Sequence, residues 1–346
     1  MNSQVKPPFL PMEALLVDEI PEGPQWQYEP KWDGFRCLVF REGDEVQLQS
    51  KSGQPLGRYF PELVAAIQAL KPKRFVIDGE IVIPVGTGIS FDELLMRIHP
   101  AASRIRKLAA EHPALLIVFD ILDDGSTEDL FEQPLQTRRT VLEAFAQRYF
   151  KGEQVRLSPK TMDQDLARNW LDRTNENLDG IIAKRIDLPY ASGERSTMQK
   201  IKKIRTADCV VGGFRYGSKS KLVGSLLLGL YENGLLHHVG FCSGIKTTDK
   251  AALTGKLEKL IEPPGFTGRA PGGPSRWSSE RSTEWNPLKP QLVVEVAYDH
   301  FTGGRFRHGT KLVRWRPDKA AEQCGMEQVQ QHSVQALRVT GGSVTA

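Results

Sequence analysis

The stretch EPKWDGFR, residues 29–36, places a lysine among turn-forming residues and aromatic side chains. Pro30, Asp33 and Gly34 favour a turn. The apolar run CLVF, residues 37–40, follows at once and predicts a strand that runs into the core. Lys31 is therefore either a solvated turn residue or a reactive amine held in a strand–turn–strand element.

The composition is that of a globular protein with enough chain for two domains. Of 346 residues, 25% are charged and 40% are hydrophobic. No apolar stretch approaches the roughly 20 residues that span a bilayer. Residues 1–20 lack the basic and apolar regions of a secretion signal. The cysteines form no CxxC pair and predict neither a zinc site nor a disulfide framework, so we expect a cytoplasmic protein.

The first part of the chain mixes strand and helix patterns. Strands are expected at residues 36–40, 46–50, 74–84, 114–122 and 179–185. Helices are expected at residues 61–70, 90–99, 137–150 and 163–176. Because the strands do not alternate regularly with helices, we predict an α+β fold with antiparallel sheets rather than a doubly wound parallel sheet.

After about residue 205 the sequence is rich in strand patterns. Asn233-Gly234 predicts a type I′ hairpin turn between two apolar runs. One helix pattern, at 248–261, and a Pro/Gly-rich loop, at 262–277, interrupt the strands. We predict a small β-barrel, with the OB-fold as first choice, over residues 206–346. This part has a net charge of +6 against −2 for residues 1–205, which suggests either a polyanion partner or a solvated basic face.

Several charged residues stand in apolar strand patterns, where a charge has to be paired, hydrogen-bonded or metal-bound. Glu80 follows Asp78-Gly79, Asp120 follows Phe119, and Asp179 opens a strand that ends with Lys184. Lys200 and Lys202 alternate, so both point to one face of a strand. Taken singly, each is explained as readily by a satisfied turn aspartate, a surface pair or a solvated edge.

Their order along the chain is more specific: K-x-D-G-x-R, D-G-E, F-D, [DE]-G-x-x-x-K and K-x-K, followed by RWRPDK at residues 314–319. In this order the chain resembles the covalent nucleotidyltransferase superfamily, and within it the ATP-dependent DNA ligases. Its compact form is most similar to the bacterial stand-alone LigC type and the ligase domain of LigD. The resemblance implies an adenylyltransferase domain over residues 1–205, followed by the OB-fold domain.

The resemblance implies that Lys31 attacks the α-phosphorus of ATP and forms a lysyl–AMP intermediate. AMP then passes to the 5′-phosphate of a nick, and the 3′-hydroxyl displaces it. Other residues are expected to bind the nucleotide: Glu29 at the adenine amino group, Phe119 stacking on adenine, Arg36 at the ribose or the nick phosphate, Lys200 and Lys202 at the α-phosphate, and Lys51 and Lys184 elsewhere in the pocket. Glu80 and Asp179 are the expected ligands of a divalent cation, Mg²⁺ or Mn²⁺.

The final motif and the basic residues complete the expected site. Arg316, Asp318 and Lys319 would close over the β- and γ-phosphates in the first step and then swing away. Nicked duplex DNA would be held through its phosphates. The candidate DNA contacts are Arg36, Lys202, Lys203, Arg205, Arg215, Lys219, Lys221, Arg305, Arg307 and Lys311.

With no added DNA-binding domain before residue 29, the two domains would clamp DNA themselves, or repair proteins would bring it. We expect a monomeric, nucleoid-associated bacterial enzyme of DNA repair.

Three positions depart from the family pattern. Asp179 replaces the usual Glu, Met198 an often aromatic residue, and Lys51 the Arg of many ligases. Two other readings stay open: a GTP-using capping-type guanylyltransferase, and a DNA-binding relative without catalytic activity. NAD-dependent ligases are disfavoured, because the chain lacks their N-terminal extension and four-cysteine zinc module.

Overall fold

The computed structural model describes residues 5–86, 88–126, 130–172, 178–218, 220–272 and 284–329. These residues form two compact units that divide between Lys203 and Ile204. The predicted boundary after Arg205 lies two residues further on, at the start of a strand. In the described part of the chain, no helix is long and apolar enough to cross a membrane.

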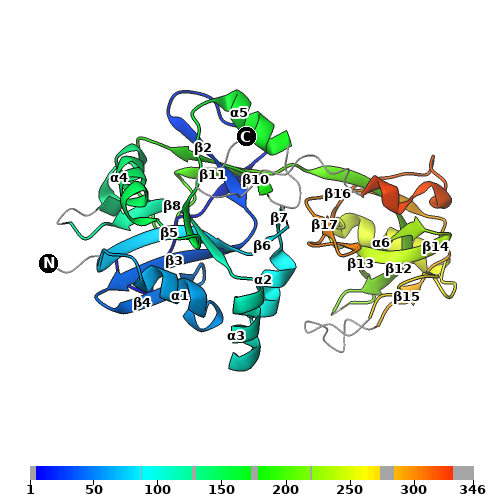
Figure 1. The fold of residues 1–346 in the computed structure, drawn as a ribbon. Coiled ribbons are helices and arrows are strands. Elements are labelled where there is room, and N and C mark those ends of the chain that lie inside the picture. Colours follow the sequence, from blue (N-terminus) through cyan, green and yellow to red (C-terminus); the bar gives the residue numbers. More distant parts are fainter. Residues whose placement is uncertain are drawn as a thin grey trace. The chain divides into compact units, whose positions relative to one another are not determined.

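The first unit contains eleven of the described strands and five of the described helices (Figure 1). Its strands are β1 (Leu15–Val17), β2 (Trp26–Trp32), β3 (Phe35–Glu42), β4 (Glu45–Ser50), β5 (Arg74–Val82), β6 (Pro84–Val85), β7 (Gly88–Ile89), β8 (Leu115–Asp123), β9 (Val155–Leu157), β10 (Leu178–Arg185) and β11 (Met198–Ile201). Its helices are α1 (Pro61–Gln68), α2 (Phe91–Arg97), α3 (Ala102–Glu111), α4 (Leu135–Tyr149) and α5 (Gln164–Asp172). Every strand and helix predicted here is present, although residues 173–176 of the last predicted helix lie outside the described residues; α3, β1, β7 and β9 are additions.

Two sheets form the frame of this unit. One has the order β4-β3-β5-β8-β9, the other β1-β11-β10-β2, and a small β6–β7 hairpin stands apart. The pairs are antiparallel except for β1 with β11 and β8 with β9. Successive residues of β5 pack into different clusters: Ile77 lies with α1 and α4, while Val76 lies with Tyr190 and Met198. Alternate side chains are thus buried on both faces of the five-stranded sheet, as its nearly continuous apolar strands require.

The glycine of the opening motif allows a close approach between backbones. Gly34 lies in the turn from β2 to β3, and a Cβ atom there would stand 2.1 Å from the carbonyl oxygen of Ile81 on β5. Any side chain would push the turn away from β5. The motif therefore places Lys31, on β2, beside the strand that carries Glu80.

The second unit is built on one large sheet, with one α-helix among its described residues. Its strands are β12 (Arg205–Tyr216), β13 (Val223–Glu232), β14 (Leu235–Cys242), β15 (Asn286–Pro287), β16 (Val293–Tyr298), β17 (Phe301–Thr302), β18 (Arg305–Phe306) and β19 (Lys311–Trp315), and its helix is α6 (Lys250–Glu258). Asn233 and Gly234 have φ of 52° and 76°, as the predicted hairpin turn requires.

The sheet of the second unit has the order β14-β13-β12-β16-β19, with β15 pairing β12. A parallel bridge between Cys242, at the end of β14, and Thr310, just before β19, joins the two outer strands at one point. The amide of Thr310 donates to the carbonyl oxygen of Phe241 at 3.1 Å there. Among the described residues the barrel is thus partly open, as is typical of an OB-fold.

A buried ion pair crosses the core of the first unit. Asp120 on β8 accepts hydrogen bonds from Nε and Nη2 of Arg138 on α4, at 2.8 and 2.9 Å, and both side chains are 1% exposed. Burial alone would raise the pKa of Asp120, but the charge and hydrogen bonds of Arg138 hold it below its ordinary value. The aspartate of the F-D pattern therefore fastens α4 to the sheet.

We expect Asp120→Ala to lower the free energy of unfolding by about 3–5 kcal/mol, because the Arg138 guanidinium would be left in the core without its counter-ion. Urea denaturation at neutral pH measures the change. Asp165→Ala, which removes an exposed ion pair with Arg168, serves as control and should have little effect. A loss below about 1 kcal/mol for Asp120→Ala would contradict this assignment.

Candidate active site

A pocket of about 200 Å³ opens in the first unit, between its two large sheets. Strands β2, β10 and β11 supply one side, β3, β5 and β8 the other, and residues 11–14 close a third. Eight of the predicted nucleotide-site residues line it: Glu29, Lys31, Arg36, Lys51, Glu80, Phe119, Lys184 and Lys200. The sequence motifs, up to 171 residues apart, thus meet in one place.

Lys31 is held by a carboxylate at this pocket. Its Nζ lies 2.5 Å from Oδ2 of Asp179, and Nζ of Lys202 lies 3.0 Å from the same oxygen. Burial alone would raise the pKa of Asp179, but the charges of Lys31 and Lys202 hold it below its ordinary value. One ionised carboxylate thus bridges the expected nucleophile and an expected phosphate-binding lysine.

The backbone around Asp179 explains how the carboxylate reaches both amines. The pairing of β10 with β2 shifts register between Leu178 and Ile181, and Gly180 has a φ of 130°. A Cβ atom at Gly180 would stand 2.0 Å from the carbonyl oxygen of Ile201. Only glycine permits this close approach to β11, and the irregularity re-aims the Asp179 side chain.

Glu80 lies on β5 near Lys31. Burial raises the pKa of its carboxyl to about 7, although the charges of Lys31 and Arg36 oppose the shift. The nearby cations thus do not fully offset the burial of this carboxyl group, and carboxylate oxygens are ligands that Mg²⁺ and Mn²⁺ accept. The side chains of Glu80 and Asp179 therefore fit the donor set expected for a metal ion.

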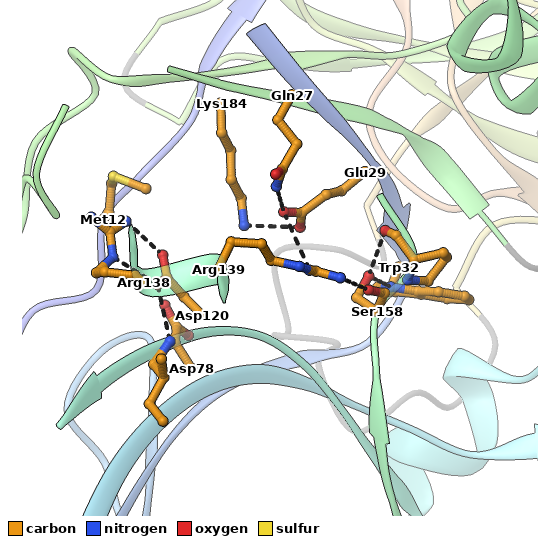
Figure 2. Close-up of polar contacts among 12 residues, drawn as sticks. Met12, Gln27, Glu29, Trp32, Asp78, Asp120, Arg138, Arg139, Ser158 and Lys184 are labelled. Carbon is orange, nitrogen blue, oxygen red and sulfur yellow. Dashed lines mark hydrogen bonds and ion pairs between the residues drawn. The ribbon is translucent and has the colours of Figure 1, made fainter. Parts of the chain in front are cut away.

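Glu29 lies deeper and takes part in a buried polar network (Figure 2). Its Oε2 accepts from Nζ of Lys184 at 2.8 Å, and its Oε1 accepts from Nε2 of Gln27 at 2.7 Å. Arg139 of α4 adds a cation 3.9 Å from Oε1 and donates to the carbonyl oxygen of Ser158 at 2.6 Å. Lys184, Gln27 and Arg139 thus fix the Glu29 carboxylate. The sequence alone did not predict that Gln27 and Arg139 take part in the site.

Arg36, expected to contact the nucleotide or the nick, forms an ion pair with Asp78 of the protein. Its Nε and Nη2 donate to the two oxygens of Asp78, both at 2.6 Å, and its guanidinium lies 4.6 Å from the centre of the Phe119 ring. Tyr190 donates its hydroxyl to Asp78 at 2.6 Å. Nζ of Lys184 lies 4.5 Å from the centre of the Phe119 ring. The ring expected to stack on adenine is therefore in contact with two cations.

Further basic side chains, Lys51, Arg195 and Lys200, lie at the mouth of the pocket. Glu13 pairs with Lys51 at 3.2 Å and with Arg195 at 2.8 Å, which hold its pKa below the ordinary value. Burial, then the charges of Lys31 and Lys202, lower the pKa of Lys200. Neither Glu13 nor Arg195 was predicted for the site, although Arg195 lies in the YASGERS stretch just before the paired lysines.

The residues of the final motif form a separate ion cluster in the second unit. Arg316 donates through Nη1 to Asp208, at 2.9 Å, and through Nη2 to Asp318, also at 2.9 Å. Lys319 donates to Asp208 at 2.7 Å. Asp208 was not predicted as a functional residue, because a lone aspartate after K-x-K carries no motif signal.

The expected DNA contacts differ in their surroundings. Arg305, Lys221 and Lys311 are exposed. Lys203 donates to the carbonyl oxygen of Asp172 at 3.2 Å. Arg205, Arg215 and Arg307 are partly buried, and burial lowers the pKa of Arg215. Lys219 lies outside the described residues.

Comparison with known proteins settles the family. Residues 11–202 match the family described as ATP dependent DNA ligase domain, and residues 219–319 match the ATP dependent DNA ligase C terminal region. The chain belongs to the ATP-dependent DNA ligases. The predicted adenylyltransferase-plus-OB-fold class is therefore confirmed, and the capping-type alternative is set aside.

Two similar proteins are mycobacterial. DNA ligase C2 of Mycolicibacterium smegmatis is 43% identical to this ligase, across 95% of this chain and 96% of that protein. DNA ligase C of Mycobacterium tuberculosis is 42% identical with the same coverage. A solved Lig E DNA ligase matches with a TM-score of 0.55 at 13% identity, over 88% of this chain and 100% of that one, and shows likeness of fold alone. The expected likeness to the LigC type is confirmed.

We expect Arg36→Lys to lower the free energy of unfolding by about 1–3 kcal/mol. A lysine cannot donate to both oxygens of Asp78 at once and cannot lie flat on Phe119, so a buried carboxylate would lose a partner. Thermal or urea unfolding measures the loss, and Lys73→Ala, which removes an exposed pair with Asp44, is the control. Equal stability of Arg36→Lys and the native protein would contradict this role.

Proposed function

We propose that this ligase seals nicks between a 5′-phosphate and a 3′-hydroxyl in duplex DNA, using ATP and a lysyl–AMP intermediate on Lys31. In this proposal residues 1–205 act as the adenylyltransferase domain and residues 206–346 as the OB-fold domain. The observation that carries the proposal is the position of Lys31 at the pocket lined by the expected nucleotide-binding residues, 2.5 Å from Asp179.

In the first step the lone pair of Lys31 Nζ attacks the α-phosphorus of ATP. A P–N bond forms as the P–O bond to pyrophosphate breaks, so pyrophosphate leaves with the bonding electrons. The amine loses a proton to solvent before it attacks, and Oδ2 of Asp179, 2.5 Å away, holds Nζ in position. Lys200 and Lys202 supply positive charge for the α-phosphate, since phosphoryl transfer depends mainly on charge neutralisation and positioning.

Glu80 and Asp179 would hold the divalent cation that this family uses, Mg²⁺ or Mn²⁺. When bound, the cation neutralises negative charge on the phosphates. The shorter Asp179, where the family has Glu, does not disturb the contacts to Lys31 and Lys202.

The buried network supports ATP rather than GTP. Adenine presents a 6-amino donor where guanine presents an oxygen acceptor. Lys184 and Gln27 fix the Glu29 carboxylate, whose oxygens accept hydrogen bonds, so it suits an amino group and disfavours an oxygen acceptor. We therefore assign Glu29 to the adenine amino group and Phe119 to the adenine face.

In the later steps AMP passes from Lys31 to the 5′-phosphate, and attack by the 3′-hydroxyl then joins the strands and releases AMP. Arg316, Asp318 and Lys319 act on the β- and γ-phosphates in the first step only. The basic side chains named above hold the DNA backbone, so binding should weaken steeply as salt rises. We place the enzyme in DNA repair, as a nucleoid-associated monomer that repair proteins recruit.

We expect Lys31→Ala to lose self-adenylation and nick sealing entirely while the protein stays folded, because no other amine replaces the nucleophile. Transfer of label from α-labelled ATP to protein, together with sealing of a nicked duplex, measures both activities. Lys107→Ala, on the exposed surface of α3, is the control and should behave as the native protein does. An AMP adduct on the Lys31→Ala protein would refute the assignment.

A further inference from the structure

Asp208 binds the cations of the final motif, although it lies 108 residues before Arg316 in the chain. It sits on β12 with a side chain that is 12% exposed. Its two oxygens accept from Nη1 of Arg316 at 2.9 and 3.0 Å, and Oδ2 also accepts from Nζ of Lys319 at 2.7 Å. One nearly buried carboxylate therefore holds both expected phosphate-binding cations together.

Hydrogen bonds also fix the backbone of Asp208. The backbone amide of Asp208 donates to Oε1 of Gln328 at 3.1 Å, and Nε2 of Gln328 donates back to the Asp208 carbonyl at 3.2 Å. The amide of Arg316 donates to the carbonyl oxygen of Val293 on β16, the strand next to β12. Asp208 lies in a strand, and Arg316 directly follows β19 with its backbone hydrogen-bonded to β16, so the backbone holds both side chains in place.

Asp318 has a different place in the cluster. It binds the other edge of Arg316, with Oδ1 3.0 Å from Nε and Oδ2 2.9 Å from Nη2, and its side chain is 64% exposed. A guanidinium has five N–H donors and an ammonium has three. After their contacts with Asp208, both cations keep donors for phosphate oxygens, and Asp208 fixes the separation between them.

We propose that Asp208 is a positioning residue for the reaction with ATP: it presents Arg316 and Lys319 as one preformed pair of cations for the pyrophosphate part of the nucleotide. This inference rests on the proposed role of these two residues in the first step. Without the carboxylate, two like charges would repel each other and their long side chains would lose a common orientation.

The test variant is Asp208→Asn, which keeps the shape of the side chain and removes its charge. We expect self-adenylation with ATP to slow by roughly 10- to 100-fold, as for loss of a hydrogen bond to a charged group. Sealing of a nick that already carries 5′-AMP should stay within twofold of the native rate. Reversal of the lysyl–AMP adduct by pyrophosphate should need a correspondingly higher pyrophosphate concentration.

Glu295→Gln is the matched control. Glu295 pairs with Asp208 across β12 and β16, but its carboxylate binds Arg314 at 2.6 Å. This variant should keep both activities. Asp208→Glu retains the charge, displaces it by one methylene, and should recover part of the lost adenylation rate, which a purely structural role would not predict.

Equal loss of self-adenylation and of pre-adenylated nick sealing in Asp208→Asn would overturn the proposal, since Asp208 would then support the fold. Faster adenylation would also overturn it, because the carboxylate would be a competitor of the phosphates. If Asp208→Asn fails to fold, the comparison is made with Asp208→Glu, and equal loss of self-adenylation and of pre-adenylated nick sealing there rejects the positioning role. Failure of the native protein to form an AMP adduct would instead reject the proposed function.

Discussion

The site is organised around one oxygen atom. Oδ2 of Asp179 lies 2.5 Å from the Lys31 ammonium and 3.0 Å from that of Lys202, so a cation on β2 and a cation just after β11 share a single counter-ion. In a partly buried setting, such like charges would repel strongly without that carboxylate. The irregularity at Gly180, the close approach of β10 to β11 and the tight turn at Gly34 all serve to bring these three side chains together.

The same pattern, cations gathered around fewer carboxylates, recurs in both units. At the pocket mouth Glu13 pairs with Lys51 and Arg195, and in the second unit Asp208 pairs with Arg316 and Lys319. Each carboxylate orders long basic side chains before a ligand is present, which lowers the entropy lost when phosphates bind. The positive surplus that remains suits a triphosphate and a DNA backbone, the two polyanions that an ATP-dependent DNA ligase handles.

Local patterns in the sequence predicted much of the fold, because the physical signals are local. Short apolar runs marked β3, β5, β8 and β10, and Asn233-Gly234 marked the hairpin turn. Helix α3 was missed because its apolar face is narrow: only Ile105 of its ten residues is buried, and Leu108 and Ala109 are half-buried. Lys200 and Lys202, expected on one face of a strand, both lie near Lys31, although Lys202 follows the last residue of β11.

The partners within the site were harder to predict, because each pairing joins segments far apart in sequence. Nothing near Glu29 in the sequence indicates Arg139, and nothing near Lys319 indicates Asp208. Asp78 and Asp120 were recognised as charges in apolar strands, but only the folded chain shows that arginines neutralise them. Sequence motifs therefore predicted which residues meet, while the charge balance among them required the three-dimensional structure.

The central claim is that Lys31, and no other lysine of this crowded cationic pocket, becomes the covalent carrier. Mass spectrometry of the native protein after incubation with ATP and Mg²⁺, followed by peptide mapping, tests this most directly. The account predicts one added AMP per chain, on the peptide that contains Lys31, and its disappearance on addition of pyrophosphate. An adduct on Lys200 or Lys202, or no adduct with ATP under conditions in which the protein is folded, would contradict it.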